Sequence, residues 1–149
     1  MSKVYLTLPQ SELLKFQQWT KTLTTENQNK CERLVRSTCF NIVRRAMRFS
    51  PVNFGFLKSS IGTDANSKRM SGAIWAGGIG KGVNVRYAPY VEFGTGSGVS
   101  VPPELQEYAL QFKGRGLRKV NRRAQPYFFP SVNLGMKEML MELNKMGFK

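Results

Sequence analysis

The chain has 149 residues and a formal net charge of +14, from 23 Lys and Arg against 9 Asp and Glu. This length fits a single domain, and a field of this size and sign attracts nucleic acid, acidic membranes or acidic proteins. The sequence has no histidine and two cysteines, which excludes a structural zinc site and removes the commonest general base. We therefore expect no metal site and no cofactor.

The N-terminal region predicts a strand and a short helix. Residues 3–8, KVYLTL, alternate and are rich in strand formers, and Pro9 ends the pattern. Ser11 can then cap a short helix whose apolar residues are Leu13, Leu14, Phe16 and Trp19. The N-terminus lacks the apolar core of a signal peptide, and no run approaches the roughly 20 apolar residues of a membrane span. We expect a protein made in the cytoplasm that does not contact a membrane.

A long helix is predicted from about residue 26 to 49. Thr25 and Gln28 have the spacing of a capping box at its start. The two cysteines would lie about 12 Å apart along it, beyond the roughly 7 Å reach of a disulfide, so we interpret them as small core residues of a reducing compartment. Apolar residues recur at intervals of three and four and predict one buried stripe: Cys31, Leu34, Val35, Cys39, Ile42, Val43, Ala46, Met47 and Phe49.

The same helix carries a basic face. Its arginines lie mostly off the apolar stripe: Arg33, Arg36, Arg44, Arg45 and Arg48. A solvated face and a contact face are equally consistent with this pattern.

The middle of the chain predicts an antiparallel meander. Pro51 turns the chain after the long helix. Strands are expected around residues 60–63, 72–76 and 83–87, with Gly77-Gly78 and Gly80–Gly82 as the turns between the last two. The connection after the first strand, DANSKRM, is polar.

The last third combines a basic segment with a helix. Pro103 and Glu104 could start a short helix, and residues 113–123 hold Lys113, Arg115, Arg118, Lys119, Arg122 and Arg123 with no acid, which we interpret as a mobile basic arm. Pro126 and Pro130 bracket three aromatic residues, and a final helix is predicted over 131–146 with Gly147 at its C-cap.

These elements predict one α+β domain over residues 1–149. A small antiparallel β-sheet would pack against the long N-terminal helix and the C-terminal helix, with a long basic loop. Its parts are an N-terminal strand (1–9), helices (11–49), strands (50–95), the basic flexible loop (96–123) and the C-terminal helix region (124–149).

Glu92 is the one acid in an apolar, aromatic setting, within YAPYVEFGTGSG at residues 87–98. A buried carboxylate can be an acid or base with a raised pKa, but no nucleophile, metal ligand or second carboxylate lies near it in sequence. We therefore expect a non-catalytic role, in which Glu92 accepts hydrogen bonds from backbone amides or an arginine. The glycine-rich segments lack the Lys-Ser/Thr ending and the helix of a phosphate loop.

Three segments, in order, resemble one family, the tail-completion (head–tail joining, or neck) proteins of long-tailed, siphophage-type bacteriophages. SPVNFGFLKSSI, residues 50–61, is similar to the family's Pro-x-Asp-x-Gly-x-Leu-x-x-Ser-Ile, with departures at Asn53, Phe54 and Phe56. YAPYVEFGT, residues 87–95, resembles Tyr-Ala-x-Tyr-Val-Glu-Phe-Gly-Thr, and AQPYFFPSV, residues 124–132, resembles Ala-Gln-Pro-Phe-x-x-Pro-Ala. The residues of these motifs that we single out are Pro51, Gly55, Leu57, Tyr87, Tyr90, Glu92, Phe93, Gly94, Gln125, Pro126, Phe128 and Pro130.

The resemblance implies a non-enzymatic virion protein. Such proteins form a ring, usually sixfold, at the head-proximal end of the tail tube and join the tail to the head-completion (stopper or adaptor) proteins below the portal. The basic arm would contact an acidic surface of an adjoining neck or tube protein, or DNA in the lumen. The alternative function is sequence-independent nucleic-acid binding through the basic helix face and loop.

The resemblance also gives expectations for single positions. Tyr87 would end a strand, Ala88-Pro89 would turn the chain, and Tyr90, Val91 and Phe93 would pack against the long helix or a neighbouring subunit. Gly94 would adopt a positive φ. We expect that Tyr127, Phe128 and Phe129 cannot all point inward, so that one anchors the next subunit; the alternative is that all three cover the sheet.

Overall fold

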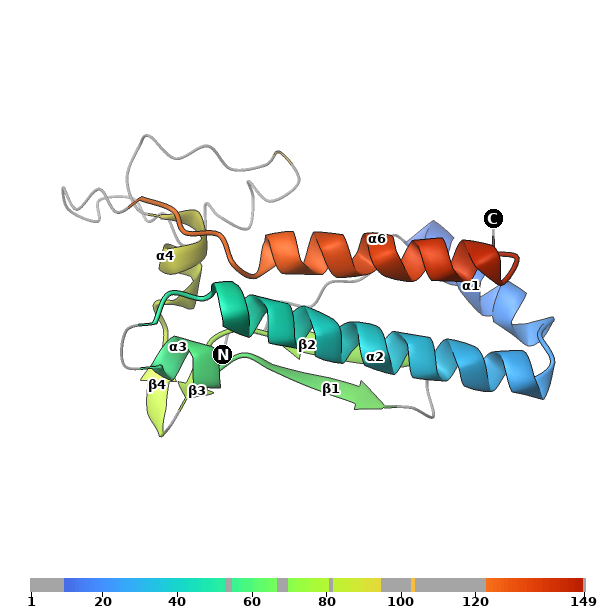
Figure 1. The fold of residues 1–149 in the computed structure, drawn as a ribbon, viewed down its shortest axis with the longest axis horizontal. Helices are drawn as coiled ribbons and strands as arrows, with labels where there is room; N and C mark the ends of the chain where they lie inside the picture. The colour runs from blue at the N-terminus through green and yellow to red at the C-terminus, as the bar shows by residue number, and fades with distance from the viewer. Residues whose placement is uncertain are drawn as a thin grey trace.

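A computed structural model describes residues 10–52, 55–66, 70–80, 82–94, 103 and 123–148. It has the α+β architecture expected from the sequence, with two long helices and short antiparallel strands (Figure 1). The strand predicted at residues 3–8, the helix predicted from Glu104 and the basic residues from Lys113 to Arg122 lie outside these ranges.

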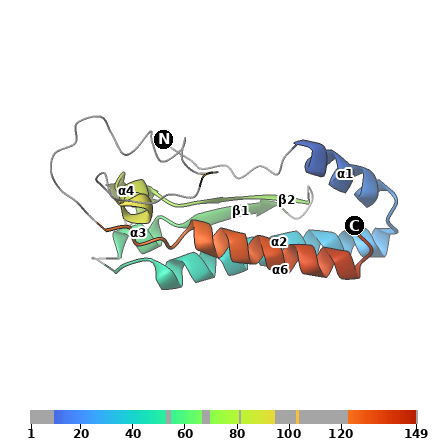
Figure 2. The same cartoon turned by 90° about the horizontal axis from the view of Figure 1, so that it is seen from above.

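Helix α2, Thr25–Phe49, is the centre of the fold. Helix α6, Phe129–Lys145, runs antiparallel beside it, and a β-hairpin packs on another side of α2 (Figures 1 and 2). The predicted apolar stripe is buried along most of its length, and both cysteines are buried and free, as expected. Phe49 is an exception, with 61% of its surface exposed, because it is the last helical residue before the chain turns away at Ser50.

The α2–α6 contact has two specific features. Gly135 lies directly over Ile42, so close that a Cβ at residue 135 would approach the isoleucine side chain to less than 3.0 Å. Nearby, Nη2 of Arg45 donates to both carboxylate oxygens of Glu138, at 2.9 and 3.2 Å. Arg45 therefore belongs to the helix pair, unlike the other arginines of α2.

The strands form two separate hairpins, so the single meander predicted from the sequence is wrong. β1 (Gly62–Asn66) pairs with β2 (Ser71–Trp75), and β3 (Gly78–Gly80) pairs with β4 (Val83–Val85), both antiparallel. Gly77 and Gly78 have φ of +96° and +91°, a left-handed conformation that turns the chain between β2 and β3 and prevents one continuous ladder. Gly78 and Gly80, which the sequence assigned to turns, are therefore the first and last residues of strand β3.

Two predicted helix caps are displaced. Helix α1, Gln10–Lys21, already includes Ser11, which is therefore not its cap. At the start of α2 the cap is Thr24, whose hydroxyl accepts from the Asn27 amide at 3.4 Å, because Thr25 is already helical. The Gln28 side chain instead donates to the carbonyls of Thr20 and Leu23.

The C-terminus of α6 closes as the sequence predicts. Gly147 has φ +96°, its amide donates to the Asn144 carbonyl, and the Phe148 amide donates to the Leu143 carbonyl. These two bonds form a Schellman motif. They place the Phe148 ring against α1, with centroids 5.8 Å from Phe16 and 5.2 Å from Trp19.

Candidate functional site

The residues of the YVEFG segment form a short helix at one end of the molecule. Helix α4 spans Ala88–Phe93 and lies near α3 and the β3–β4 hairpin (Figure 1). The prediction that Ala88-Pro89 is a turn is wrong. Proline is tolerated in the first helical turn, because an amide hydrogen at that position would have no intrahelical acceptor in any case. Strand β4 correspondingly ends at Val85, and Tyr87 precedes the helix rather than ending a strand.

Gly94 ends α4 with φ +71°, the positive value expected for it. Val91 and Phe93 are buried, and Tyr87 and Tyr90 are half-buried. Val91 and Phe93 thus pack against the rest of the chain.

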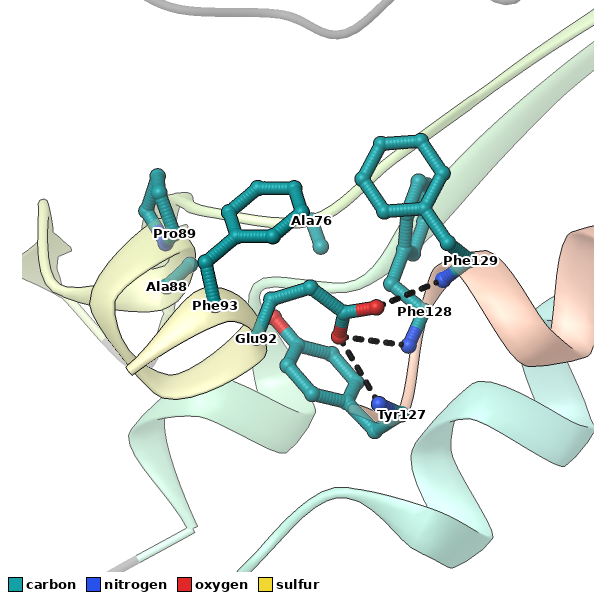
Figure 3. A pocket seen from close by; sticks show the side chains of 8 residues that line it. All are labelled: Ala76, Ala88, Pro89, Glu92, Phe93, Tyr127, Phe128 and Phe129. Atoms are coloured by element: carbon teal, nitrogen blue, oxygen red, sulfur yellow. Dashed lines mark hydrogen bonds between the residues drawn. The ribbon is translucent and has the colours of Figure 1, made fainter. Parts of the chain in front are cut away.

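The carboxylate of Glu92 binds the chain just before and at the start of α6. Oε2 accepts from the amides of Tyr127 and Phe128 at 2.8 and 2.9 Å, and Oε1 accepts from the amide of Phe129 at 2.9 Å (Figure 3). A fourth bond runs from the Gln125 amide to the Val91 carbonyl at 2.8 Å. Of the two acceptor roles expected for Glu92, the structure has the one with backbone amides.

The start of α6 explains why an acid is needed here. The first amides of a helix have no intrahelical acceptor, and Phe128 at the cap position has a side chain that cannot accept a hydrogen bond. A carboxylate satisfies these donors and also interacts favourably with the positive end of the helix dipole. Glu92 therefore caps α6 from another element of the fold.

Burial and hydrogen bonding oppose each other at Glu92. Only 5% of its surface is exposed, and this burial raises the pKa of the carboxyl group, while the amides of Phe128, Tyr127 and Phe129 partly offset the rise. A raised pKa in a cleft can indicate a catalytic acid. Here both oxygens are occupied by three amides, and the adjoining cavity of about 20 Å³, lined by Ala76, Pro89 and Phe93 among others, has room for roughly one water molecule.

All three aromatic residues around the start of α6 are buried, so the prediction that they cannot all point inward is wrong. Tyr127, Phe128 and Phe129 are exposed by only 1%, 3% and 7%. The Phe129 ring lies 5.6 Å from both the Phe93 and Phe128 rings. All three lie in the core cluster that also contains Ile74 and Val85 of the strands, in agreement with the alternative expectation that all three cover the sheet. Each of the three amides points to Glu92, which lets successive side chains turn into the core.

The first resembling segment reaches the same core from helix α3, Phe56–Ser59. Gly55 precedes α3 with φ +73°, and Leu57 is 2% exposed. Ser60, which directly follows α3, accepts a hydrogen bond from the Gly77 amide at 3.2 Å. Pro51 is half-buried, and Asn53 and Phe54 lie outside the described residues.

Other candidates lie on the surface. Gln125, Pro126 and Pro130 are exposed beside the Glu92 corner, as is Arg123, the one residue of the basic arm that the structure describes. On α2 the structure separates Arg45, paired with Glu138, from four exposed arginines: Arg33, Arg36, Arg44 and Arg48. Sequence reasoning missed the roles of Gly135 and Glu138, because both depend on a contact between helices far apart in the chain.

Within the described ranges, no three His, Cys, Asp or Glu side chains lie close enough together to hold a metal ion. None of the helices in this part of the chain combines the length and apolar character needed to cross a bilayer. Comparison with protein-family models, with curated proteins and with solved structures finds no match.

Proposed function

We propose that this chain is a structural virion protein of a long-tailed bacteriophage. It forms a ring, of six subunits by the resemblance, at the head-proximal end of the tail tube. There it joins the tail to the head-completion proteins below the portal. It acts by shape and surface and carries no catalytic residue or cofactor.

One observation carries the proposal. The second and third segments that resemble the tail-completion family meet in space, through three bonds to the Glu92 carboxylate and one between Gln125 and Val91. The motif residues of these two segments thus act together, because they hold α4 against the start of α6. A chance resemblance of short segments would not require them to meet.

The same corner supports a structural role for Glu92. Both oxygens of its carboxylate accept hydrogen bonds from backbone amides. These bonds stabilise the fold, and a catalytic carboxylate would have to break them in order to react. Gln125, Pro126 and Pro130 are exposed next to this rigid corner and are suitable contacts for a neighbouring subunit. The arm from Lys113 to Arg123 supplies the charge for an acidic surface of a tube or neck protein.

A null mutation in the phage that encodes the chain tests the proposal. We expect full heads beside free tails in electron micrographs, with joined, infectious particles restored when the wild-type gene is supplied from a plasmid. Immunogold labelling should place the protein at the neck, and negative staining should show a ring at one end of isolated tails. A matched plasmid carrying Glu142→Gln, a change at an exposed helical site, should restore joining equally well.

Two results would contradict the proposal. Joined, infectious particles made in normal yield by the null mutant would exclude a joining role. Labelling of the host cell and not of purified particles would exclude a virion protein.

A further inference from the structure

The outer face of α2 carries exposed arginines around one phenyl ring. We define the arginine stripe as Arg33, Arg36, Arg44 and Arg48, with Phe40 between them. All five are exposed, on the side of the helix opposite its buried residues, and 3.6 residues per turn brings them onto one face about 22 Å long. We propose that the arginine stripe binds the phosphate backbone of duplex DNA without reading its sequence.

The protein itself does not neutralise the stripe. Among the residues that the structure describes, its four arginines take part in no ion pair, whereas three other basic groups do. Glu26, in the first turn of α2, pairs with Lys30 at 2.9 Å, and its attraction to Arg33 is weaker than its attraction to Lys30. The Arg36 guanidinium lies over the Phe40 ring, 5.9 Å from its centroid, which orders one cation without neutralising its charge.

The chemistry of the stripe favours a polyanion over a protein partner. A protein interface is built around an apolar centre, and here Phe40 is the single apolar side chain, 46% exposed and flanked by Arg36. Of the other large exposed apolar side chains, Phe49 is the last residue of α2, on the side of the helix away from the stripe, and Leu134 and Met141 lie on α6. A second copy of the chain would bring its own excess of positive charge against the stripe, which is repulsive.

The form of the stripe favours duplex over single-stranded DNA. Single strands are bound in grooves with aromatic platforms for successive bases, whereas α2 presents a convex face with one ring. Guanidinium groups bind phosphate oxygens in a bidentate manner, and such contacts position a duplex without specifying its sequence. The inference does not depend on the proposed neck function and would hold for the isolated protein.

The test is fluorescence anisotropy with a labelled 30-base-pair duplex of mixed sequence, titrated with full-length protein between 50 and 200 mM NaCl. The stripe variant is R33Q/R36Q/R44Q/R48Q, since glutamine keeps helix propensity. Its control removes the same charge from exposed lysines elsewhere: K15Q/K21Q/K58Q/K137Q. Circular dichroism and thermal melting check that each variant is folded.

We expect the stripe variant to bind at least about tenfold more weakly at 100 mM NaCl, with a salt slope shallower by roughly three to four, about one for each lost phosphate contact. The control should lose much less. Replacing all four arginines by lysine should weaken binding less than replacing them by glutamine, because lysine keeps the charge and loses only the bidentate geometry. Should the glutamine variant unfold, a photo-cross-linker at Ser37, on the stripe, should label the duplex, and one at Asn133 on α6 should not.

Three outcomes would overturn the inference: no binding of wild-type protein at 50 mM NaCl, equal losses in the stripe and control variants, or equal labelling from both positions. A stripe variant that binds the duplex normally but no longer restores head–tail joining would assign the face to an acidic protein instead.

Discussion

Replacement of Glu92 is the most direct perturbation of this fold, because its carboxylate holds the start of α6. In Glu92→Gln the shape is kept and the charge is lost. The carbonyl oxygen of glutamine can take the place of Oε2 and accept from Tyr127 and Phe128, which leaves its NH₂ group facing the Phe129 amide. One hydrogen bond becomes a contact between two donors, and the interaction with the helix dipole is lost.

The size of the effect follows from these contacts. A hydrogen bond to a charged group contributes about 1.5–3 kcal/mol, and an unsatisfied buried amide costs about 1–3 kcal/mol. We therefore expect Glu92→Gln to lower the free energy of unfolding by about 2–3 kcal/mol. Glu92→Ala leaves all three amides without their acceptor and should cost about 4–6 kcal/mol, since water entering the space can reconnect some of them. Total stabilities of about 5–15 kcal/mol are typical, so the alanine variant would be close to unfolding at 37 °C.

The assay is urea unfolding at pH 7, followed by far-UV circular dichroism, with Glu142→Gln as the matched control. Glu142 is on the exposed face of α6 and pairs with Lys145, so its change should stay within about 0.5 kcal/mol. A cost below about 1 kcal/mol for Glu92→Gln would refute the reasoning, because the amides of residues 127–129 would then find other acceptors.

The pH dependence of stability tests the balance of forces at the same carboxyl group. Burial raises the pKa of Glu92 above the ordinary value of 4.5 despite the opposing amides. Between pH 4.5, the ordinary pKa taken for the unfolded state, and the raised pKa of the folded state, the folded state binds a proton more readily than the unfolded state. Wild-type stability, relative to Glu92→Gln, should be greatest below pH 4.5 and fall as the pH rises through the raised pKa. A relative stability that instead increases over this range would show that the amides outweigh burial.

The remaining predictions concern the helix contacts. Gly135→Ala should lower the free energy of unfolding by about 1–3 kcal/mol in urea, because its methyl group meets Ile42; no change would mean that the helices can shift apart. Phe148→Ala should increase hydrogen exchange in α1 while α2 stays protected, since that ring joins α1 to the end of α6. Cys31 and Cys39 are buried, and burial raises the pKa of both thiols, so a thiol reagent should label them rapidly only in urea. Rapid labelling of the native protein would contradict their burial.

Local patterns predicted the two long helices well. The apolar spacing of α2 and the glycine after α6 are each contained in one short segment, and both carry enough information to place the element. The helix contacts could not be predicted in the same way. Gly135 and Ile42 are complementary in shape only once the helices are side by side. The sequence of one segment does not indicate which residue of the other it contacts.

The errors of prediction occurred where one residue type suits two structures. Pro89 is as compatible with the first turn of a helix as with a bend. The helix is the structure that places Glu92, one turn later, where it accepts hydrogen bonds from the amides of residues 127–129. Gly77 was correctly predicted to turn the chain, but Gly78 begins strand β3. The positive φ values of both glycines separate the strands into two hairpins instead of joining them in one sheet.

The same corner explains how the fold can accommodate a long segment between Gly94 and Arg123. Helix α6 begins without a side-chain cap of its own, and the amides of residues 127–129 at its start are bound by Glu92 of α4. The residues that Glu92 joins are 35 to 37 positions away in the chain, and the entropy cost of bringing two points of a chain together grows only slowly with the number of residues between them. Changes at Glu92 or in the positions of the three amides should therefore affect the whole helix pair.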